Sequence, residues 1–474
     1  MSSILLRARL GVLLAVAACV HRPPHIEGGP GAPAQPNVYW TPPPSVTRAA
    51  ERDRGTTTRI STSLASLDAV IDLALRNNPV TRLSWAQARA AADVYGASRG
   101  SWFPTLSLDA TATRSRSLAV PGRPAGERTQ YGPSIGLSYL VLDFGGRAGN
   151  IDAARQTAIA MDLSHNAAVQ NTILAVELAL FNYLASRALR DAERVAVDEA
   201  TASLNSAEER RRVGLATVAD VLQARTARSQ AQLALESLEG AVQVAHGGLA
   251  VAMGLPPTAT FEVPRLTAAP PIDSIQCVTE SVDSLIATAT RARPDLAAAR
   301  AQAAAAAAEV RVARSALLPA ISLNANSGYS ASNVSTFQGR TYTLSLGFDL
   351  PLFSGFSRDY ALANASEQLE AANARTDASR QQIALQVFTA YYTLQTATER
   401  VRTAADLLAS ATESESVARG RYREGVGSIV DLLIAQSALA DARAQDAQAR
   451  WQWRGALAQL AHDVGTLGLH GEIR

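Results

Sequence analysis

The stretch GPSIGLSYLVLDFGGR, residues 132–147, decides the fold because it joins two segments of different periodicity. Its first part alternates apolar residues with smaller ones, at Ile135, Leu137, Tyr139 and Val141. A period of two predicts a β-strand over about 132–142. From Gly145 to Arg212 the chain has no proline, which allows one helix of about 65 residues, or roughly 100 Å at 1.5 Å per residue.

The same order of features occurs twice along the chain. Matching positions in the two halves are Asn78-Pro79 and Arg293-Pro294, Phe103-Pro104 and Leu318-Pro319, Gly214 and Gly425, and Asp220 and Asp431. The two proline pairs share one offset, and the two later pairs share another. This period is far too long for a solenoid repeat. We expect a duplicated half-protein, with a first repeat over 64–265, a linker over 266–279, a second repeat over 280–468 and a tail over 469–474.

Three further segments alternate in the same way, over about 105–116, 320–330 and 341–350. One apolar face and one small polar face over about ten residues are typical of a membrane barrel with a wet lumen. Two half-buried soluble hairpins are the alternative. Aromatic residues cluster at the strand ends, as interfacial girdles do, and favour the barrel: Trp102, Phe103, Tyr131, Phe144, Tyr342, Phe353 and Phe356.

The second repeat contains its own very long helical segment, 357–423, again without proline. Its apolar residues recur at steps of four and three, at Ile383, Val387, Ala390, Leu394, Ala397, Val401, Ala404 and Leu408. This is the seam of a coiled coil. After Gly214 and Gly425 the chain returns in helices of about 40 residues. Each repeat therefore predicts a helix, two strands, a very long helix and a returning helix.

Four strands cannot close a barrel, and an open sheet edge cannot lie in lipid. Two copies would give eight strands, whose interior side chains fill, whereas three copies would give twelve strands around a channel. The fold class we expect is a mixed membrane β-barrel and all-α coiled-coil barrel, formed by a homotrimer.

The first 18 residues have the pattern of a bacterial signal peptide. Arg7 and Arg9 precede the apolar run 10–18, which is too short to span a bilayer. The run ends in Val16-Ala17-Ala18-Cys19, and small residues before a cysteine resemble a lipobox. An ordinary signal peptide followed by a chance cysteine is the alternative.

Resemblance to bacterial lipoproteins implies a covalent lipid on Cys19, with several acyl chains that anchor the protein stably. It also implies that Val20 permits sorting to the outer membrane. Residues 19–63 are rich in proline and glycine and predict an extended tether. The second cysteine, Cys277, has no partner for an intrachain disulfide.

Composition and motifs argue against other functions. With 44 basic and 42 acidic residues, the net charge of +2 gives no footprint for nucleic acid. No phosphate loop, HExxH or CxxC pattern occurs, so we expect neither an enzyme nor a cofactor. The six histidines lack the spacing of metal ligands: His21, His25, His165, His246, His462 and His470.

The chain resembles the TolC-like outer-membrane efflux factors over about 64–468, and especially their lipidated branch. The motifs that carry the resemblance are LDAVIDLALRNNP (67–79), LDFGGR (142–147), LFSGFSR (352–358), VGLATVADVL (213–222) and YREGVGSIVDLLIAQ (422–436). Each alone is weak, but their duplicated order is specific. The resemblance implies a trimer with a twelve-stranded barrel in the outer membrane, continuous with a long periplasmic α-barrel.

In that family the helical tips meet a periplasmic adaptor (a membrane fusion protein), which couples the duct to an inner-membrane pump, here expected to be a proton-driven RND pump. The residues that match the adaptor-contacting tips are Val213, Gly214, Leu215, Glu424, Gly425 and Val426. A helix-to-helix turn without a partner is the alternative.

Asp220, Tyr422 and Asp431 match family positions that close the tips or line the aperture. The two carboxylates could instead stabilise the first turn of each returning helix, and Tyr422 could be seam packing. Gly427 stands where some members carry a gating arginine, and Ile434 where some carry a second aperture aspartate. The resemblance therefore implies a gate that is weaker or built differently, with Arg423 as the substitute.

The function expected is the outer-membrane channel of a tripartite efflux pump, passively conducting small toxic molecules or drugs out of the periplasm. A type I secretion duct and a lipid-anchored periplasmic coiled-coil scaffold are the alternatives. Only three methionines occur, at Met1, Met161 and Met253, which argues against a thioether path for soft copper ions.

Overall fold

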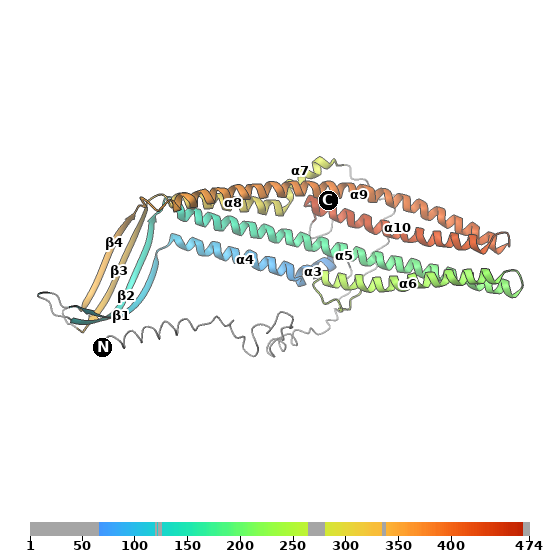
Figure 1. The fold of residues 1–474 in the computed structure, drawn as a ribbon, viewed down its shortest axis with the longest axis horizontal. Helices are drawn as coiled ribbons and strands as arrows, with labels where there is room; N and C mark the ends of the chain where they lie inside the picture. The colour runs from blue at the N-terminus through green and yellow to red at the C-terminus, as the bar shows by residue number, and fades with distance from the viewer. Residues whose placement is uncertain (1–65, 119–120, 122–125, 264–279, 334–337, 468–474) are drawn as a thin grey trace, which may run out of the picture. The chain divides into compact units, whose positions relative to one another are not determined.

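The computed structural model describes residues 66–118, 121, 126–263, 280–333 and 338–467 (Figure 1). The helices and strands belong to one compact unit, Thr62–Thr258 with Glu262–Arg474. The expected signal peptide, Cys19, the tether, Cys277 in the 266–279 linker and the 469–474 tail lie outside the described residues.

Each half begins with a pair of helices that breaks at a proline. The pairs are α3 (Leu67–Asn77) with α4 (Pro79–Arg99), and α7 (Val282–Ala292) with α8 (Pro294–Ser315). Proline suits the first helical position because its missing N–H would have no partner there. Asn78 caps α4 by accepting a hydrogen bond from the Val80 amide at 2.8 Å. A short 3₁₀ helix, Gly100–Trp102, then leads toward the first strand.

The four strands form one antiparallel sheet in the order β1-β2-β3-β4. They are β1 (Thr105–Ser117), β2 (Gly126–Leu142), β3 (Ala320–Ser332) and β4 (Gly339–Asp349). β2 begins before the expected residue 132. The central pairing joins β2 of the first half to β3 of the second, so both halves contribute to a single sheet.

The register places apolar residues on one face of the sheet. Leu108 lies opposite Ile135, Leu137 opposite Ala325, and Ala325 opposite Leu344. This face is open, since Leu108 is 74% and Leu344 71% exposed. Small polar residues line the other face, among them Ser107, Ser138, Asn324, Asn326 and Thr343. An exposed apolar face opposite a polar one is the pattern of a lipid-facing barrel wall.

The long helices have the lengths that the sequence predicts. α5 (Gly146–Arg212) and α9 (Ser357–Arg423) contain 67 residues each, and α6 (Val218–Ala252) and α10 (Ile429–Val464) return from their ends. α5 packs against α4, α6, α8 and α10, and α9 packs against α8 and α10. The helices therefore form a layer in which α8 and α10 lie between α5 and α9.

Among the described residues, one helix is long and apolar enough to cross a membrane by length and composition alone. That helix is α5, whose most apolar 18-residue window has a mean hydropathy of 1.3 and is 33% buried within the chain. A bilayer needs only about 20 residues, so the length of α5 far exceeds this requirement.

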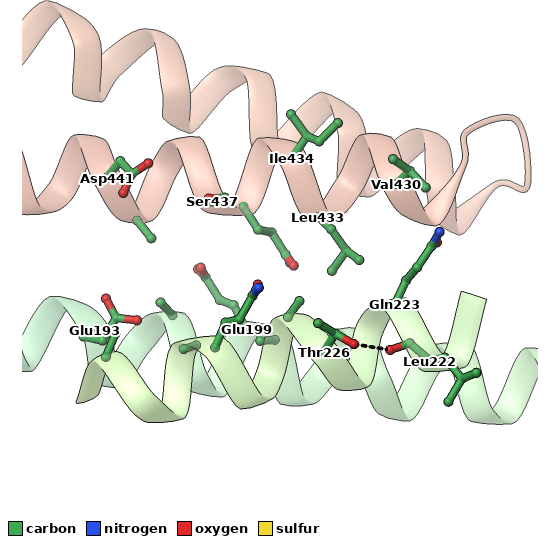
Figure 2. Close-up of a pocket in the computed structure, with 18 residues that line it drawn as sticks. Glu193, Glu199, Leu222, Gln223, Thr226, Val430, Leu433, Ile434, Ser437 and Asp441 are labelled. Atoms are coloured by element: carbon green, nitrogen blue, oxygen red, sulfur yellow. Dashed lines mark hydrogen bonds between the residues drawn. The ribbon is translucent and has the colours of Figure 1, made fainter. Parts of the chain in front are cut away.

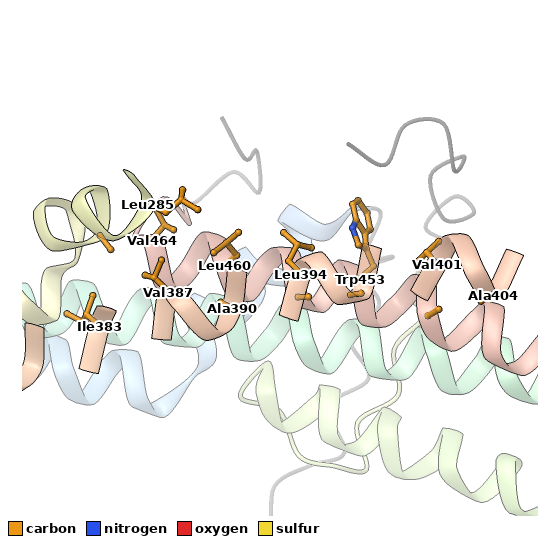
Figure 3. Close-up of a cluster of buried hydrophobic side chains, with 14 of the residues drawn as sticks. Leu285, Ile383, Val387, Ala390, Leu394, Val401, Ala404, Trp453, Leu460 and Val464 are labelled. Carbon is orange, nitrogen blue, oxygen red and sulfur yellow. The ribbon is translucent and has the colours of Figure 1, made fainter. Parts of the chain in front are cut away.

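The predicted coiled-coil seam of α9 is the centre of an apolar cluster (Figure 3). Ile383, Val387 and Leu394 on α9 pack with Trp453 on α10 and with Leu285 on α7. The Trp453 indole Nε1 donates to the hydroxyl of Thr398 at 3.2 Å, so its polar atom is paired inside the layer. With Leu296 of α8 in the same cluster, the seam thus joins four helices of the second half.

The corner between sheet and helix has unusual backbone geometry in both halves. Phe144 and Gly145 have φ of 50° and 99°, and Gly355 and Phe356 each have φ of 63°. Positive φ reverses the chain within two residues. In the first corner the buried Arg147 donates to the Leu140 carbonyl at 2.7 Å and lies 4.2 Å from the Trp102 ring. Arg147 thereby ties the end of β2 to the start of α5.

Candidate functional site at the helical tips

The two helical hairpins each end in a tight glycine turn. Gly214 and Gly425 have φ of 81° and 78°, a left-handed conformation that favours glycine. The Leu215 amide donates to the Arg210 carbonyl at 2.7 Å, and the Val426 amide donates to the Arg421 carbonyl at 3.0 Å. Val213, Leu215 and Val426 are 61%, 74% and 69% exposed. Each tip therefore presents apolar side chains to the outside.

Asp220 and Asp431 cap the helices that return from the tips. Asp220 Oδ2 accepts from the Thr217 amide at 2.7 Å, and the Asp220 amide donates to Thr217 Oγ1 at 3.2 Å. Ser428 and Asp431 form the same reciprocal box, at 3.4 and 3.1 Å. Such boxes satisfy amides that a helix start leaves unpaired. Asp220 and Asp431 thus both act as helix caps, and these hydrogen bonds use only Oδ2 of each carboxylate.

Arg210 connects the two tips, a role that sequence reasoning missed. Its Nη2 donates to the carbonyls of Tyr422 and Arg423 at 2.5 and 2.7 Å, and its guanidinium lies 4.3 Å from the Tyr422 ring. Tyr422 is buried, and burial raises the pKa of its hydroxyl. The Arg423 side chain is exposed and makes no ion pair with the described residues. In the sequence, the only signal for the role of Arg210 was the run of three consecutive arginines, 210–212, at the end of α5.

Gly427 and Ile434 are the two positions at which the sequence departs from the family pattern, and they lie in different surroundings. A Cβ added at Gly427 would lie 3.0 Å from Arg421 Cβ and 3.2 Å from its carbonyl carbon. A side chain at this position would therefore crowd the preceding turn. Ile434 is 64% exposed and lines an open groove between the hairpins.

A polar network joins the hairpins just beyond the tips, and we name it the cross-hairpin network. Arg443 on α10 binds Glu199 on α5 through two hydrogen bonds of 3.1 and 3.2 Å. Arg419 on α9 lies 3.6 Å from the same carboxylate and 2.7 Å from the buried Glu415. Gln436 accepts from Ser203 Oγ at 3.0 Å. These contacts connect α5, α9 and α10, so separating the hairpins requires breaking them.

The groove between the hairpins, which we name the tip groove, has a volume of about 700 Å³ (Figure 2). α5, α6 and α10 line it, and Glu193, Glu199 and Asp441 are its charged residues. Glu199 belongs to the cross-hairpin network, whereas Glu193 and Asp441 form no ion pair with the described residues. Burial raises the pKa of Glu193, and the negative charge of Asp441 raises it further.

The geometry of this end of the molecule suits docking and gating. Within the described ranges, no group of three or more histidine, cysteine or acidic side chains could hold a metal ion. The tip region instead combines exposed apolar turns, bonds between the hairpins and an acidic groove. An acidic lining favours cations over anions in a narrow passage.

Comparisons with known proteins identify the family of the chain. The family model described as outer membrane efflux protein matches residues 70–255 and 285–466. Protein CyaE of Bordetella pertussis is 30% identical over 452 residues, covering 94% of this chain and 90% of that protein. The toluene efflux pump outer membrane protein TtgC of Pseudomonas putida is 26% identical over 385 residues, covering 80% and 78%.

The fold also matches that of a solved outer membrane protein. The crystal structure of VceC from Vibrio cholerae superimposes with a TM-score of 0.75 at 21% identity, covering 84% of this chain and 96% of that one. The expected fold, with duplicated halves of helix, two strands, long helix and returning helix, is therefore confirmed. The chain belongs to the outer membrane efflux protein family, and it is an outer-membrane channel that extends into the periplasm and not an enzyme.

Proposed function

We propose that the chain is the outer-membrane duct of a tripartite efflux pump and conducts small toxic molecules or drugs passively out of the cell. One observation carries the proposal: the sheet is open, with an exposed apolar face and outer edges at β1 and β4 that pair with no other described strand. Unpaired edges cannot lie in hydrocarbon, because nothing there satisfies their backbone groups. Neighbouring copies must complete the wall.

Three copies are the assembly that leaves a passage. Eight strands enclose an interior that side chains fill, whereas twelve leave a channel. The polar face with Ser107, Asn324 and Asn326 then lines the lumen, and Leu108 and Leu344 face lipid. The 67-residue α5 and α9 extend the wall by roughly 100 Å into the periplasm.

The tips supply the docking surface for a periplasmic adaptor. Val213, Leu215 and Val426 are exposed on their tight turns. Glu424, Gly425 and Gly214 complete the two turns. Asp220 and Asp431 cap their helices and also lie near the aperture. The tips are held closed, until the adaptor engages them, by Arg210, Tyr422 and the cross-hairpin network.

The remaining parts of the proposal concern the anchor and the pump. A lipid on Cys19 holds each chain in the outer membrane through several acyl chains, which anchor more firmly than one. The energy comes from an inner-membrane pump, which we propose is of the proton-driven RND type. The name of the relative TtgC, a toluene efflux protein, supports small toxic cargo.

The decisive experiment is purification of the full-length protein from outer membranes in detergent. We expect a trimer by native mass spectrometry, loss of the trimer on heating, and discrete conductance steps in planar bilayers. Mass spectrometry of the mature chain should show an acylated N-terminus, and Cys19→Ser should abolish this mass shift without abolishing conductance of the purified trimer.

The partners are tested separately by crosslinking at the tips in the producing cell. A photo-crosslinker at Val426 should capture an adaptor, and one at Ser366, on α9 far from the tip, should not. Capture together with an ABC exporter would assign the duct to type I secretion. A water-soluble monomer without conductance would refute the duct and favour a periplasmic scaffold.

A further inference from the structure

A second groove, with a volume of about 1000 Å³, lies farther from the tips between α5, α9 and α10, and we name it the aromatic groove. Phe181 on α5 stacks on Trp451 of α10 with ring centres 6.1 Å apart. Phe388 and Tyr392 on α9 form a second ring pair at 4.8 Å and are 47% and 46% exposed. Two aromatic pairs thus flank one trough.

The volume and the floor of the aromatic groove suit a small planar molecule. Gly455 and Ala456 of α10 line the floor, and the hydroxyl and amide groups of residues such as Thr393 and Gln452 line the walls. Ligand sites in proteins have volumes of about 300–1,000 Å³ and combine aromatic walls with a few polar groups. Aromatic walls bind planar rings by offset or edge-on stacking.

The side of the helix layer on which the groove opens follows from α10. Trp453 and Leu460 pack in the apolar cluster with Leu285 of α7 (Figure 3). Gly455 is two positions from Trp453, which is about 200° around a helix of 3.6 residues per turn. The groove therefore opens on the side of the layer opposite α7.

The charge of the groove limits its ligand. Arg400 is the single charged residue in its described lining, and it makes no ion pair with the described residues. A second cation, Arg454, lies 5.2 Å from the Trp451 ring. The geometry points to the aromatic groove as a binding site for a planar aromatic molecule that carries an acidic group. The guanidinium of Arg400 pairs with the acid while the rings stack against Trp451, which lies level with Arg400 because its neighbour Trp453 bonds to Thr398.

The acidic tip groove does not prevent this binding. Along α10, Asp441 is separated from Gly455 by about 21 Å at 1.5 Å per residue. That distance exceeds the Debye length of about 8 Å at physiological ionic strength, so the carboxylates are screened from the aromatic groove. The helix layer then presents an acidic groove near the tips and an aromatic, cationic one farther from them.

The test uses the full-length trimer in lipid nanodiscs and 6-fluoro-2-naphthoate as the probe, titrated by ¹⁹F NMR. The uncharged 6-fluoro-2-naphthamide is the matched probe, and empty nanodiscs correct for partition into lipid. We expect the acid to bind about three- to fivefold more tightly than the amide, which is the effect of one exposed charge pair. Arg400→Gln should abolish this preference and leave the affinity for the amide unchanged.

Two further variants complete the design. Trp451→Ala should weaken both probes, and Glu193→Gln in the tip groove should change neither. The inference would be overturned if the wild type and Arg400→Gln bound the acid with equal affinity. It would also be overturned if the trimer bound neither probe, which would mean that a neighbouring chain covers the groove. Conductance of the same preparation separates the two proposals, because a conducting trimer that binds no probe refutes this site alone.

Discussion

Arg210 and Tyr422 lie 212 positions apart in the chain, yet they are in contact. The guanidinium of Arg210 donates a hydrogen bond to the Tyr422 carbonyl and covers the Tyr422 ring. A hydrogen bond from a charged donor contributes about 1.5–3 kcal/mol. Arg210 therefore holds the two tips together through two charge-assisted hydrogen bonds and its contact with the Tyr422 ring.

Arg210→Ala should shift the channel toward its open state. Loss of about 1.4 kcal/mol or more changes the ratio of closed to open channels by at least roughly tenfold. Single-channel recording of purified trimers measures the open probability. Arg212→Ala is the control, because Arg212 pairs only within its own helix, with Glu209 at 2.7 Å. The same open probability in both variants would remove Arg210 from the gate.

Glu177 gives the stability of the protein a pH dependence. It is 4% exposed on α5 and has no partner among the described residues, and burial raises its pKa to about 7. Because the folded chain holds this proton more tightly than the unfolded chain, stability falls as pH rises from 4.5 through about 7. Above that range the ionised carboxylate destabilises the fold by roughly 3 kcal/mol.

Glu177→Gln should therefore raise the thermal midpoint at pH 8 and change it little at pH 4.5. Circular dichroism of the detergent-solubilised protein measures both. The exposed Glu413→Gln serves as the control and should have no effect at either pH. A gain of equal size at both pH values would show that the substitution acts through packing and not through the buried charge.

At the scale of the elements, the contact between α5 and α8 depends on Gly149. A Cβ there would lie 2.8 Å from Val312 Cγ2 and 3.2 Å from the Ala308 carbonyl oxygen. Valine is stiff about its first torsion and the second atom belongs to the backbone, so neither can move easily. The two helices approach closely because this position has no side chain.

A matched pair of glycine substitutions tests this close approach. Gly240 on α6 is exposed, and an added Cβ there would meet no atom within 4 Å. Gly240→Ala should stabilise the protein by about 0.5–1 kcal/mol through helix propensity. Gly149→Ala should destabilise the protein despite the same gain in helix propensity, because the added methyl group would lie too close to α8. Equal and positive shifts in the denaturant midpoint would show that the interhelical contact has room for a methyl group.

At the scale of the whole molecule, the two faces of the sheet differ in their proposed surroundings. Leu344 and Thr343 are neighbours near the middle of β4 and point to opposite faces, since Leu344 lies opposite Ala325 and Thr343 opposite Asn326. An arginine facing lipid near the middle of a bilayer costs about 2–4 kcal/mol in a barrel strand. The same residue in a wet lumen has no such cost.

Leu344→Arg should accordingly reduce the amount of heat-modifiable trimer in the outer membrane, whereas Thr343→Arg should assemble normally. Thr343→Arg should also weaken the cation preference of the channel, because its charge lies on the lumen face. Immunoblots of unheated and heated membrane fractions measure assembly, and reversal potentials in a salt gradient measure selectivity. Failure of Thr343→Arg alone to assemble would reverse the assignment of the two faces.

Local sequence patterns alone were enough to predict the helices and strands and their order. Absence of proline from 146–212 and 357–423 allowed two helices of the observed length, and alternation with a period of two revealed all four strands. The glycine turns at Gly214 and Gly425 were also evident, because a tight turn selects glycine locally. These features depend on backbone preferences that act within one or two turns of the chain, so they can be read without knowledge of the fold.

Only the tertiary structure decided which distant residues meet. The pairing of β2 with β3, the bond from Arg210 to Tyr422, and the contact of Arg443 with Glu199 each join residues far apart in the chain. Asp220 and Asp431 had two open roles, and the capping bonds became visible only in coordinates. The physical reason is that such contacts depend on the register with which two long helices or strands pack, and local sequence preferences do not encode that register.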